Sequence, residues 1–271
     1  MNNNHFAIVM AGGIGARFWP SSTPEYPKQF IDMIGDGSSL LQTTFGRLEK
    51  IVPSANIYIV TQLRYHKIIL DQLGDKLNEE QIICEPNRRN TAPSILLASL
   101  KIQKRNPGAT IIVSPSDHSI QNEVIFKSDM EFALESAGEE NLITFGIVPT
   151  YPATGFGYVS VKVDENRLKT VLEFTEKPDE IKAKSLIDSG NYYWNSGIFV
   201  WSVNAVINGF KEYVPKLFKL FSAGFSKFNT PNEKKFISEN YPLAENISID
   251  YALLEKSNLI HLIPASFDWD D

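Results

Sequence analysis

The sequence predicts an α/β protein with a mostly parallel sheet and helices on both faces of that sheet. Short apolar segments alternate with helix-like segments through the first half of the chain, which is typical of parallel sheets. The 271 residues, 43% of them hydrophobic, suffice for a large buried core. Polar clusters follow several predicted strands, and open α/β sheets bind their ligands there. We therefore expect one ligand site at the carboxyl edge of the sheet.

The first half of the chain supplies the parallel strands. Five apolar segments are predicted strands: residues 6–10, 56–61, 81–84, 109–114 and 142–147. Ser39 is placed to cap a helix that ends before Pro53, and Gly74 is placed to end a second helix. Residues 91–103 are amphipathic and carry Pro93 in the first turn, where a helix tolerates proline.

The second half of the chain has a different order of predicted strands and helices. Residues 155–178 read as two alternating strands around a polar turn at 164–167, which predicts a hairpin or an antiparallel extension of the sheet. Residues 192–201 form another apolar strand, helices dominate to about residue 256, and residues 259–265 form a last strand. No repeat or flexible linker separates these segments. We expect residues 1–271 to form a single domain with an inserted region of mixed strands.

Composition excludes several classes of protein. The net charge of −6 argues against a nucleic acid or an anionic membrane as partner. Cys84 is the single cysteine, which rules out an internal disulfide and a zinc site built from several thiolates. The first residues lack the basic segment and the long apolar core of a signal peptide, and no segment approaches membrane length. A cytoplasmic location is expected.

The loop after the first strand, "AGGIGARFWP", predicts an anion site. It contains three glycines, Gly12, Gly13 and Gly15. Phe18 stands where a dinucleotide-binding loop needs a glycine, which excludes a dinucleotide-dependent oxidoreductase, and no Gly-Lys-Ser/Thr of a P-loop follows. The glycines can still turn backbone N–H groups toward an anion, with Arg17 and Lys28 as cations. The alternative is a tight turn with two solvated cations.

Later clusters leave two interpretations each. Asp117 follows a buried strand and suits either a Mg²⁺ ligand or a helix N-cap. Lys177 lies at a strand end, where solvated charge is the ordinary interpretation. Asn195 and Gly197 interrupt an apolar strand, which indicates a close ligand or a bulge. His118 shows no partner in the sequence, so a structural or exposed role is expected.

The order of these clusters resembles that of the sugar-1-phosphate nucleotidyltransferases, and within them the bacterial mannose-1-phosphate guanylyltransferases (GDP-mannose pyrophosphorylases). The matching segments are "MAGGIGARFWP", "PKQF", "EPNRRNTAP", "SPSDH", "GIVPTYPATGFGYV", "FTEKP", "WNSGIF" and "FDWDD". They run in the family's order from residue 10 to residue 271. The resemblance implies a GT-A-like, Rossmann-type nucleotidyltransferase fold with a mostly parallel, mixed central sheet.

The resemblance also implies a reaction and its residues. GTP and mannose 1-phosphate would give GDP-mannose and pyrophosphate, with Mg²⁺ as cofactor. The nucleotide-binding residues implied are Ala11, Gly12, Gly13, Gly15, Glu85, Asn90 and Thr91. The catalytic cations implied are Arg17, Lys28 and Lys177. The sugar-phosphate residues implied are Gly157, Glu173, Lys177 and Asn195. The metal ligands implied are Asp117 and Asp271.

These residue types suit the implied chemistry. A sugar phosphate has its second pKa near ~6, so its oxygen is an anionic nucleophile at neutral pH and needs no protein base. Cations, a metal and backbone N–H groups would neutralise and align the two anions. Glu85, ionised, offers two acceptors and no donor, which matches the two adjacent donors of guanine. We therefore expect Glu85 to favour guanine over uracil and thymine.

The end of the sequence departs from the family pattern. The family's second metal-binding carboxylate lies in a Trp-x-Asp-(apolar)-Gly motif, whereas this chain has "FDWDD" and then stops. Asp271 is the candidate, and Asp270 stays open because the two carboxylates are adjacent. The family's C-terminal β-helical region is not in this sequence, and a homodimer would be weakened without it. Arg88 stands where the family often has glycine, and no function is assigned to it.

Two other functions stay open from the sequence. One is transfer to another sugar, such as glucose 1-phosphate with dTTP or UTP. The other is a non-catalytic subunit that senses nucleotide sugars on the same fold. Retention of the cations and of Asp117 argues against the sensor, since a sensor has no need of a metal ligand.

Overall fold

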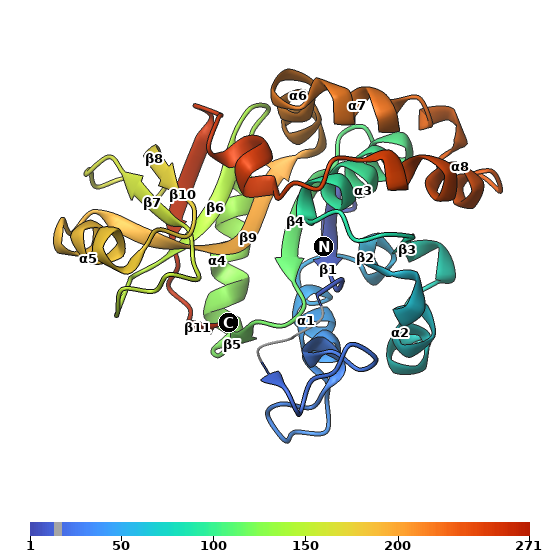
Figure 1. The fold of residues 1–271 in the computed structure, drawn as a ribbon, viewed down its shortest axis with the longest axis horizontal. Helices are drawn as coiled ribbons and strands as arrows, with labels where there is room; N and C mark the ends of the chain where they lie inside the picture. Colours follow the sequence, from blue (N-terminus) through green and yellow to red (C-terminus); the bar gives the residue numbers. More distant parts are fainter. Residues whose placement is uncertain (14–17) are drawn as a thin grey trace.

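The computed structural model describes residues 1–13 and 18–271. Within this part of the chain, nine strands form one sheet in the order β3-β2-β1-β4-β9-β6-β10-β8-β7, and β7 also pairs with β9 (Figure 1). The strands are β1 (His5–Met10), β2 (Ile57–Gln62), β3 (Ile82–Glu85), β4 (Thr110–Pro115), β6 (Leu142–Ile147), β7 (Tyr158–Val161), β8 (Lys169–Thr175), β9 (Tyr192–Ser202) and β10 (Ile260–Pro264). Two short strands, β5 (Ser119–Ile120) and β11 (Trp269–Asp270), form a separate antiparallel pair.

The parallel half of the sheet matches the expectation from sequence. β1 pairs in parallel with β2 and β4, and β2 pairs in parallel with β3. All five predicted strands of the first half are confirmed to within two residues. The predicted hairpin is also confirmed as the antiparallel pair β7 and β8. The α/β fold class is therefore confirmed.

Strand β9 is the unexpected element of the sheet. It runs antiparallel between β4 and β6, so it joins the parallel half to the mixed half. Its first residues pair instead with β7, because the eleven-residue strand is long enough to serve both neighbours. Sequence alternation predicts a strand there but carries no information on its partners.

Helices cover both faces of the sheet. The α-helices are α1 (Leu40–Leu48), α2 (His66–Leu73), α3 (Thr91–Arg105), α4 (Glu123–Ser136), α5 (Glu180–Asp188), α6 (Val203–Tyr213), α7 (Pro215–Ser222) and α8 (Glu233–Asn240). The shorter helices include η2 (Lys28–Phe30), η5 (Glu79–Gln81), η7 (Tyr241–Leu243) and a π-helix, η8 (Asp250–Leu254). Ser39 caps α1 through a full capping box, and Gly74 is the C-cap of α2, as predicted.

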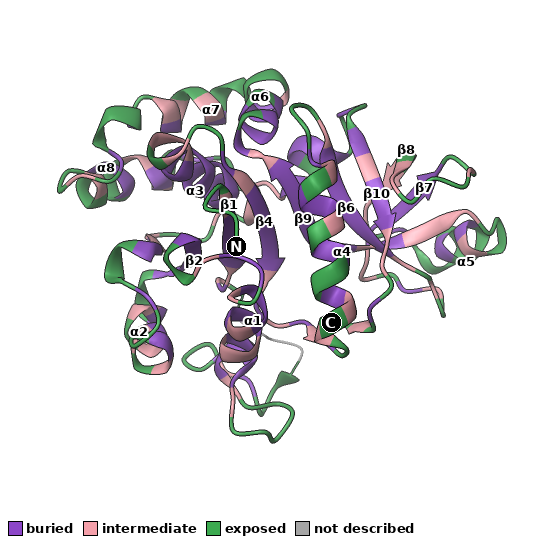
Figure 2. Cartoon of the chain, turned by 180° about the vertical axis from the view of Figure 1, so that it is seen from behind, coloured by how far each residue is buried: buried purple, intermediate pink, exposed green. Residues whose placement is uncertain are grey.

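Side chains of β1 point alternately to the two faces of the sheet, so the hydrophobic core has two layers. Phe6 and Ile8 pack with α3, α6, α7 and η8, whereas Ala7 and Val9 pack with α1, α2 and α4. Figure 2 shows the result, with buried strands between helices whose outer faces are exposed. Among the described residues, none of the helices combines the length and the apolar character needed to cross a bilayer.

Candidate active site

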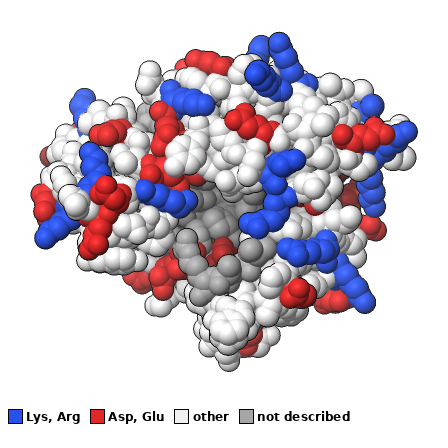
Figure 3. Space-filling view, in the orientation of Figure 1, with Lys and Arg blue, Asp and Glu red and all other residues white. Residues whose placement is uncertain are grey.

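Loops from three parallel strands converge on one cavity of about 650 Å³. Gly12 and Gly13 follow β1, Glu85 ends β3, and Pro115 ends β4, and all four line the cavity. Residues from β9, from the segment before β7, and from η8 close it. In space-filling view, this face is hollowed near its centre, with Lys or Arg side chains on two sides of the hollow (Figure 3). The predicted convergence at the carboxyl edge of the sheet is confirmed.

Two buried glutamine side chains hold the backbone carbonyls of the glycine loop in place. Gln62 Nε2 donates to the Gly12 carbonyl at 2.6 Å, and Gln29 Nε2 donates to the Gly13 carbonyl at 2.9 Å. Ala11 is buried, its carbonyl accepts from Thr61 and Gln29, and it does not line the cavity. The described loop backbone at Gly12 and Gly13 is therefore pre-organised, which is what an anion cradle requires.

Lys28 is a buried cation beside the cavity. Its side chain is 9% exposed, and its Nζ lies 4.0 Å from Asp271 Oδ1 and 4.3 Å from the ring centre of Phe18. A buried ammonium needs an anionic partner, and here the partner is a carboxylate that lines the cavity. The predicted residues Gly15 and Arg17 lie outside the described residues.

Glu85 is a buried carboxylate in the cavity wall. Oε1 accepts a hydrogen bond from the Tyr241 hydroxyl, and Oε2 lies 3.0 Å from the position of a Cβ on Gly12. Burial raises the pKa of Glu85 to about 7, against the opposing hydrogen bond from Tyr241. The carboxylate is therefore oriented by one partner and lies against the glycine loop, where a side chain on Gly12 would displace it.

Asn90 and Thr91 form the start of α3 at the same wall. Asn90 adopts a positive φ of 63°, and its side-chain oxygen accepts from the Thr91 N–H at 3.0 Å. Thr91 Oγ1 accepts from the Ile249 N–H at 2.9 Å, which ties α3 to the segment before η8. Both residues line the cavity as predicted. These hydrogen bonds serve the scaffold, so the roles of both residues toward a nucleotide stay predictions.

Two carboxylates beside the cavity can hold a divalent cation. Ligand atoms of Asp117, His118 and Asp271 lie within 4.8 Å of one another, and the carboxylate oxygens of Asp117 and Asp271 are the ligands that Mg²⁺ prefers. Asp271 lines the cavity, whereas Asp270 is exposed and belongs to the β11 pairing with β5. Asp117 is followed by β5 and no helix begins there, so its N-cap interpretation is wrong.

His118 is buried in this group, with a defined partner. Trp269 Nε1 lies 3.1 Å from His118 Nδ1, and an indole N–H is only a donor, so Nδ1 carries no proton. Nε2 lies 3.9 Å from Asp271 Oδ1, and burial lowers the pKa of His118. The expected exposed or merely structural role is therefore revised: His118 lines the cavity, and its neutral ring turns Nε2–H toward a carboxylate of the group.

A bulge aims part of β9 into the cavity. Pairing between β6 and β9 shifts register between Thr144 and Gly146, opposite Asn195 and Phe199. Asn195 and Gly197 lie in this bulge and line the cavity, and Gly197 has a φ of +71°. Bulges frequently re-aim side chains beside active sites. The segment is therefore a bulge and also faces the cavity, so the two interpretations from the sequence are compatible.

The segment after β8 brings Glu176 to the cavity in place of Glu173. Glu173 is exposed within β8 and bonds to the Tyr192 hydroxyl at 2.9 Å, and it does not line the cavity. Glu176 follows the end of β8, lines the cavity, and pairs with Lys177 Nζ at 2.7 Å. A Cβ on Gly157 would meet Glu176 Oε2 at 2.6 Å. Lys177 is exposed and does not itself line the cavity, although it pairs with Glu176, which does, and the structure does not bring Glu173 there.

Sequence reasoning assigned no role to four charged residues that line the cavity: Arg88, Arg89, Glu176 and Asp250. The rule that polar residues matter after strand ends would have selected Glu176 over Glu173. Arg89 donates to the Pro242 carbonyl, which is a contact between segments far apart in the chain. Asp250 stands in a helical segment without any local signal, and only the fold carries it to the cavity.

Comparison with known proteins identifies a family and a group of similar relatives. Residues 6–240 match the nucleotidyl transferase family model. Mannose-1-phosphate guanylyltransferases are similar over almost the whole chain: one from Salmonella montevideo is 38% identical over 97% of this chain, and one from Escherichia coli is 34% identical over all of it. The chain spans 57% and 60% of the length of these two relatives.

Solved structures agree with the sequence matches. A crystal structure of mannose-1-phosphate geranyltransferase from Thermus thermophilus superimposes with a TM-score of 0.89 at 27% identity, covering 98% of this chain and 76% of that one. One of mannose-6-phosphate isomerase from Helicobacter pylori gives a TM-score of 0.81 at 26% identity, covering 99% and 100%. The shared sheet and the match over residues 6–240 lead to one conclusion: the chain belongs to the nucleotidyl transferase family.

Proposed function

We propose that this chain transfers GMP from GTP to mannose 1-phosphate, which gives GDP-mannose and pyrophosphate. The names of the most similar relatives support both substrates. The observation that carries the proposal is that the glycine loop, Glu85 and Asp271 line the same cavity. A nucleotide laid along that cavity would have its base beside Glu85 and its phosphates beside the glycines.

The transfer needs alignment more than it needs a base. An oxygen of the sugar phosphate attacks the α-phosphorus of GTP and forms a new P–O bond. The bond between the α-phosphorus and the bridging oxygen breaks, and pyrophosphate leaves with the electron pair. The sugar phosphate is largely dianionic at neutral pH because its second pKa is about 6. The residues therefore hold two anions in line rather than remove a proton.

The charges for this task come from several residues. The backbone of Gly12 and Gly13 would cradle the triphosphate, and Lys28 would approach it from its buried position. Arg17 keeps the triphosphate role that the family resemblance implies. Asp117 and Asp271 would hold Mg²⁺, with Nε2–H of His118 turned toward Asp271. When bound, Mg²⁺ supplies positive charge that offsets the charge of the reacting phosphates.

Glu85 is the residue proposed to choose the base. Its Oε1 already accepts from Tyr241, and each carboxylate oxygen has more than one lone pair. Both oxygens can therefore accept from the adjacent N1–H and 2-amino donors of guanine. Uracil and thymine present one donor beside an acceptor, and a carboxylate would face that acceptor unpaired. This mismatch predicts a preference for GTP.

A pyrophosphate-release panel tests the proposal. The chain is incubated with each of GTP, ATP, UTP and dTTP against mannose, glucose and galactose 1-phosphates, with Mg²⁺ and with excess chelator. We expect release with GTP and mannose 1-phosphate in Mg²⁺, and little in chelator. A maximum with glucose 1-phosphate and dTTP or UTP would replace the proposed substrates. Binding of GDP-mannose without any release would favour the sensor.

A further inference from the structure

Asp250 is a cavity residue for which the proposed chemistry has given no role. It is the first residue of the π-helix η8 and lines the cavity. π-helical turns are rare and frequently occur at functional sites, because they redirect a side chain that an α-helix would place elsewhere. The position of Asp250 therefore calls for an explanation beyond packing.

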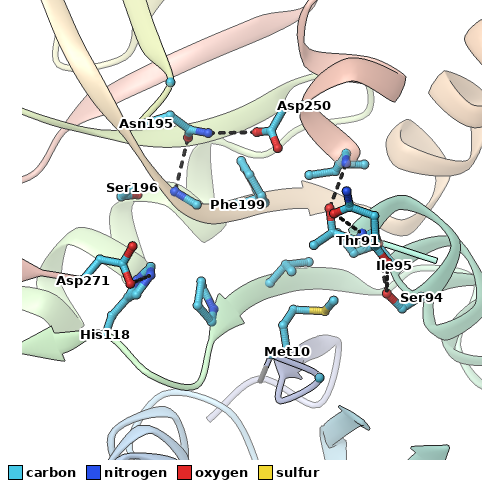
Figure 4. A pocket seen from close by; sticks show the side chains of 18 of the residues that line it. Met10, Thr91, Ser94, Ile95, His118, Asn195, Ser196, Phe199, Asp250 and Asp271 are labelled. Carbon is cyan, nitrogen blue, oxygen red and sulfur yellow. Dashed lines mark hydrogen bonds and ion pairs between the residues drawn. The ribbon is translucent and has the colours of Figure 1, made fainter. Parts of the chain in front are cut away.

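Asp250 is bonded to an amide whose orientation is fixed. Asn195 Oδ1 accepts from Thr144 Oγ1 at 2.7 Å and from the Gly197 N–H at 3.3 Å. Since this oxygen faces two donors, the amide nitrogen must point the other way, and it donates to Asp250 Oδ1 at 3.0 Å (Figure 4). One hydrogen of Asn195 Nδ2 remains for another acceptor. The second oxygen of Asp250 points away from Asn195.

This end of the cavity is suited to hydrogen-bond donors and not to anions. Asp250 and Glu176 both line it, and their charges act on each other. Burial and the neighbouring Glu176 raise the pKa of Asp250 to about 6, against the opposing effects of a backbone hydrogen bond, Lys177 and a hydrogen bond with Ser248. A phosphate would be repelled by these carboxylates, whereas hydroxyl groups could donate to them.

The phosphate of a substrate could bind on another side of the cavity. His118 and Asp271 lie on a different side of the cavity from Asn195 and Asp250 (Figure 4). Lys28 and the candidate cation group are on that side. A sugar phosphate bridging the two would place its hydroxyls at Asp250 and its phosphate near the cations. The geometry thus gives the sugar a direction in the cavity.

We propose that Asp250 is a sugar-binding residue that reads hydroxyl groups of the sugar 1-phosphate. The oxygen that does not bond to Asn195 accepts a hydrogen bond from a sugar hydroxyl, and the other oxygen holds the Asn195 amide so that the remaining N–H faces the same sugar. The inference rests on the proposed function, because it assumes a sugar 1-phosphate in this cavity. Beyond that function, the inference assigns to Asp250 the discrimination between sugars that differ in their hydroxyl groups.

The test separates this role from a structural one by using an isosteric exchange. In Asp250→Asn, the side-chain oxygen can still accept from Asn195, so the scaffold contact survives, but the atom presented to the sugar becomes a donor. Glu255→Gln is the matched control, because Glu255 is the exposed C-cap of the same helix and loses the same charge. A purely structural Asp250 would give the two variants similar kinetics.

The measurement is steady-state kinetics with mannose 1-phosphate and with its monodeoxy analogues, alongside calorimetric binding of GTP. For Asp250→Asn we expect the KM for the sugar 1-phosphate to rise about 10- to 100-fold, the range for losing a hydrogen bond to a charged group. We expect the Kd for GTP to stay within about twofold, as for a residue outside the nucleotide's contacts. Discrimination against one monodeoxy analogue, present in the wild type, should largely disappear.

The outcomes that overturn the inference are distinct. An Asp250→Asn variant with unchanged KM and unchanged discrimination overturns it while the proposed function stands. A wild-type chain that turns over no sugar 1-phosphate overturns the proposed function and this inference together. If Asp250→Asn does not fold, the smaller Asp250→Ser is measured in the same way, and the same criteria apply.

Discussion

Glu85 has one carboxylate oxygen bonded to Tyr241 and the other against the glycine loop. Burial disfavours the ionised form of Glu85 when no ligand is bound. Two hydrogen-bond donors of guanine would stabilise that ionised form. If Glu85 reads guanine as proposed, base binding would favour the ionised form of Glu85. The buried carboxylate has consequences for both nucleotide specificity and stability.

Exchanging Glu85 for glutamine should weaken the preference for guanine. The amide presents one donor and one acceptor, which matches uracil better than guanine. In Glu85→Gln, the ratio of kcat/KM for GTP to that for UTP should fall at least about tenfold, a typical effect of mispairing a buried polar group. Glu80→Gln, at an exposed position in η5, is the control. A Glu85→Gln variant with the full preference for GTP would show that another residue selects the base.

Glu85 should also make folding stability depend on pH. Its pKa is raised from 4.5 to about 7, so the folded protein keeps a proton that the unfolded chain releases between these values. The free energy of unfolding therefore falls as pH rises through this window, by up to roughly 3 kcal/mol above pH 7. Urea unfolding at pH 5 and pH 8 should show this loss in wild type and in Glu80→Gln but a smaller loss in Glu85→Gln. Parallel profiles for all three proteins would contradict the buried carboxylate.

At the residue scale, the sequence predicts side chains that follow parallel strands and misses those that the tertiary fold delivers. Gly12, Gly13, Glu85 and Asn195 lie in segments with a recognisable local pattern, and all of them line the cavity. Asp250 and Arg89 owe their positions to segments that meet only in the folded chain. Glu173 was implied by the family resemblance alone, whereas Glu176 is the glutamate that follows the end of β8 and lines the cavity.

At the scale of elements, the junction of β7, β8 and β9 shapes the sugar end of the cavity. The Asn195 N–H donates to the Gly157 carbonyl at 2.8 Å, just before β7 begins. Gly157 lies so close to Glu176 and Phe174 that a Cβ would come within 2.6 Å and 3.1 Å of their side chains. The absence of a side chain at Gly157 is therefore a condition for the packing of Glu176.

Gly157→Ala should displace Glu176 and weaken sugar binding. We expect the KM for the sugar 1-phosphate to rise at least about tenfold, because overpacking at this junction moves a cavity residue. GTP binding should change little, since Gly157 lies among the sugar-end residues. Gly46→Ala is the matched control: Gly46 lies within α1 with open space around its Cβ position, so alanine should raise stability by about 0.5–1 kcal/mol and leave KM unchanged. Equal KM values for both variants would contradict this account of the junction.

The elements themselves were largely predictable, and their pairing was not. Apolar runs bounded by turn residues located the strands of the first half, and Ser39 and Gly74 marked helix ends. The antiparallel insertion of β9 and the pairing of β11 with β5 depend on contacts between distant segments. The local sequence preference for strand or helix does not determine such contacts.

At the scale of the whole molecule, one continuous sheet carries both ends of the cavity. Its parallel half presents the glycine loop, Glu85 and the segment after β4, and its mixed half presents Gly157, Asn195 and Glu176. β9 pairs with strands of both halves, so it fixes the distance between the two groups. Such a rigid frame suits a reaction that depends on alignment of two substrates.

In the proposed reaction, the sugar phosphate attacks the α-phosphorus of GTP within this cavity. The most direct measurement follows radioactive phosphate in two parallel reactions of the 271-residue chain with mannose 1-phosphate and Mg²⁺. With GTP labelled at the α-phosphate, the label should appear in GDP-mannose. With GTP labelled at the γ-phosphate, it should appear in pyrophosphate. Transfer of the γ-label to the sugar, or no transfer of either label, would contradict the account.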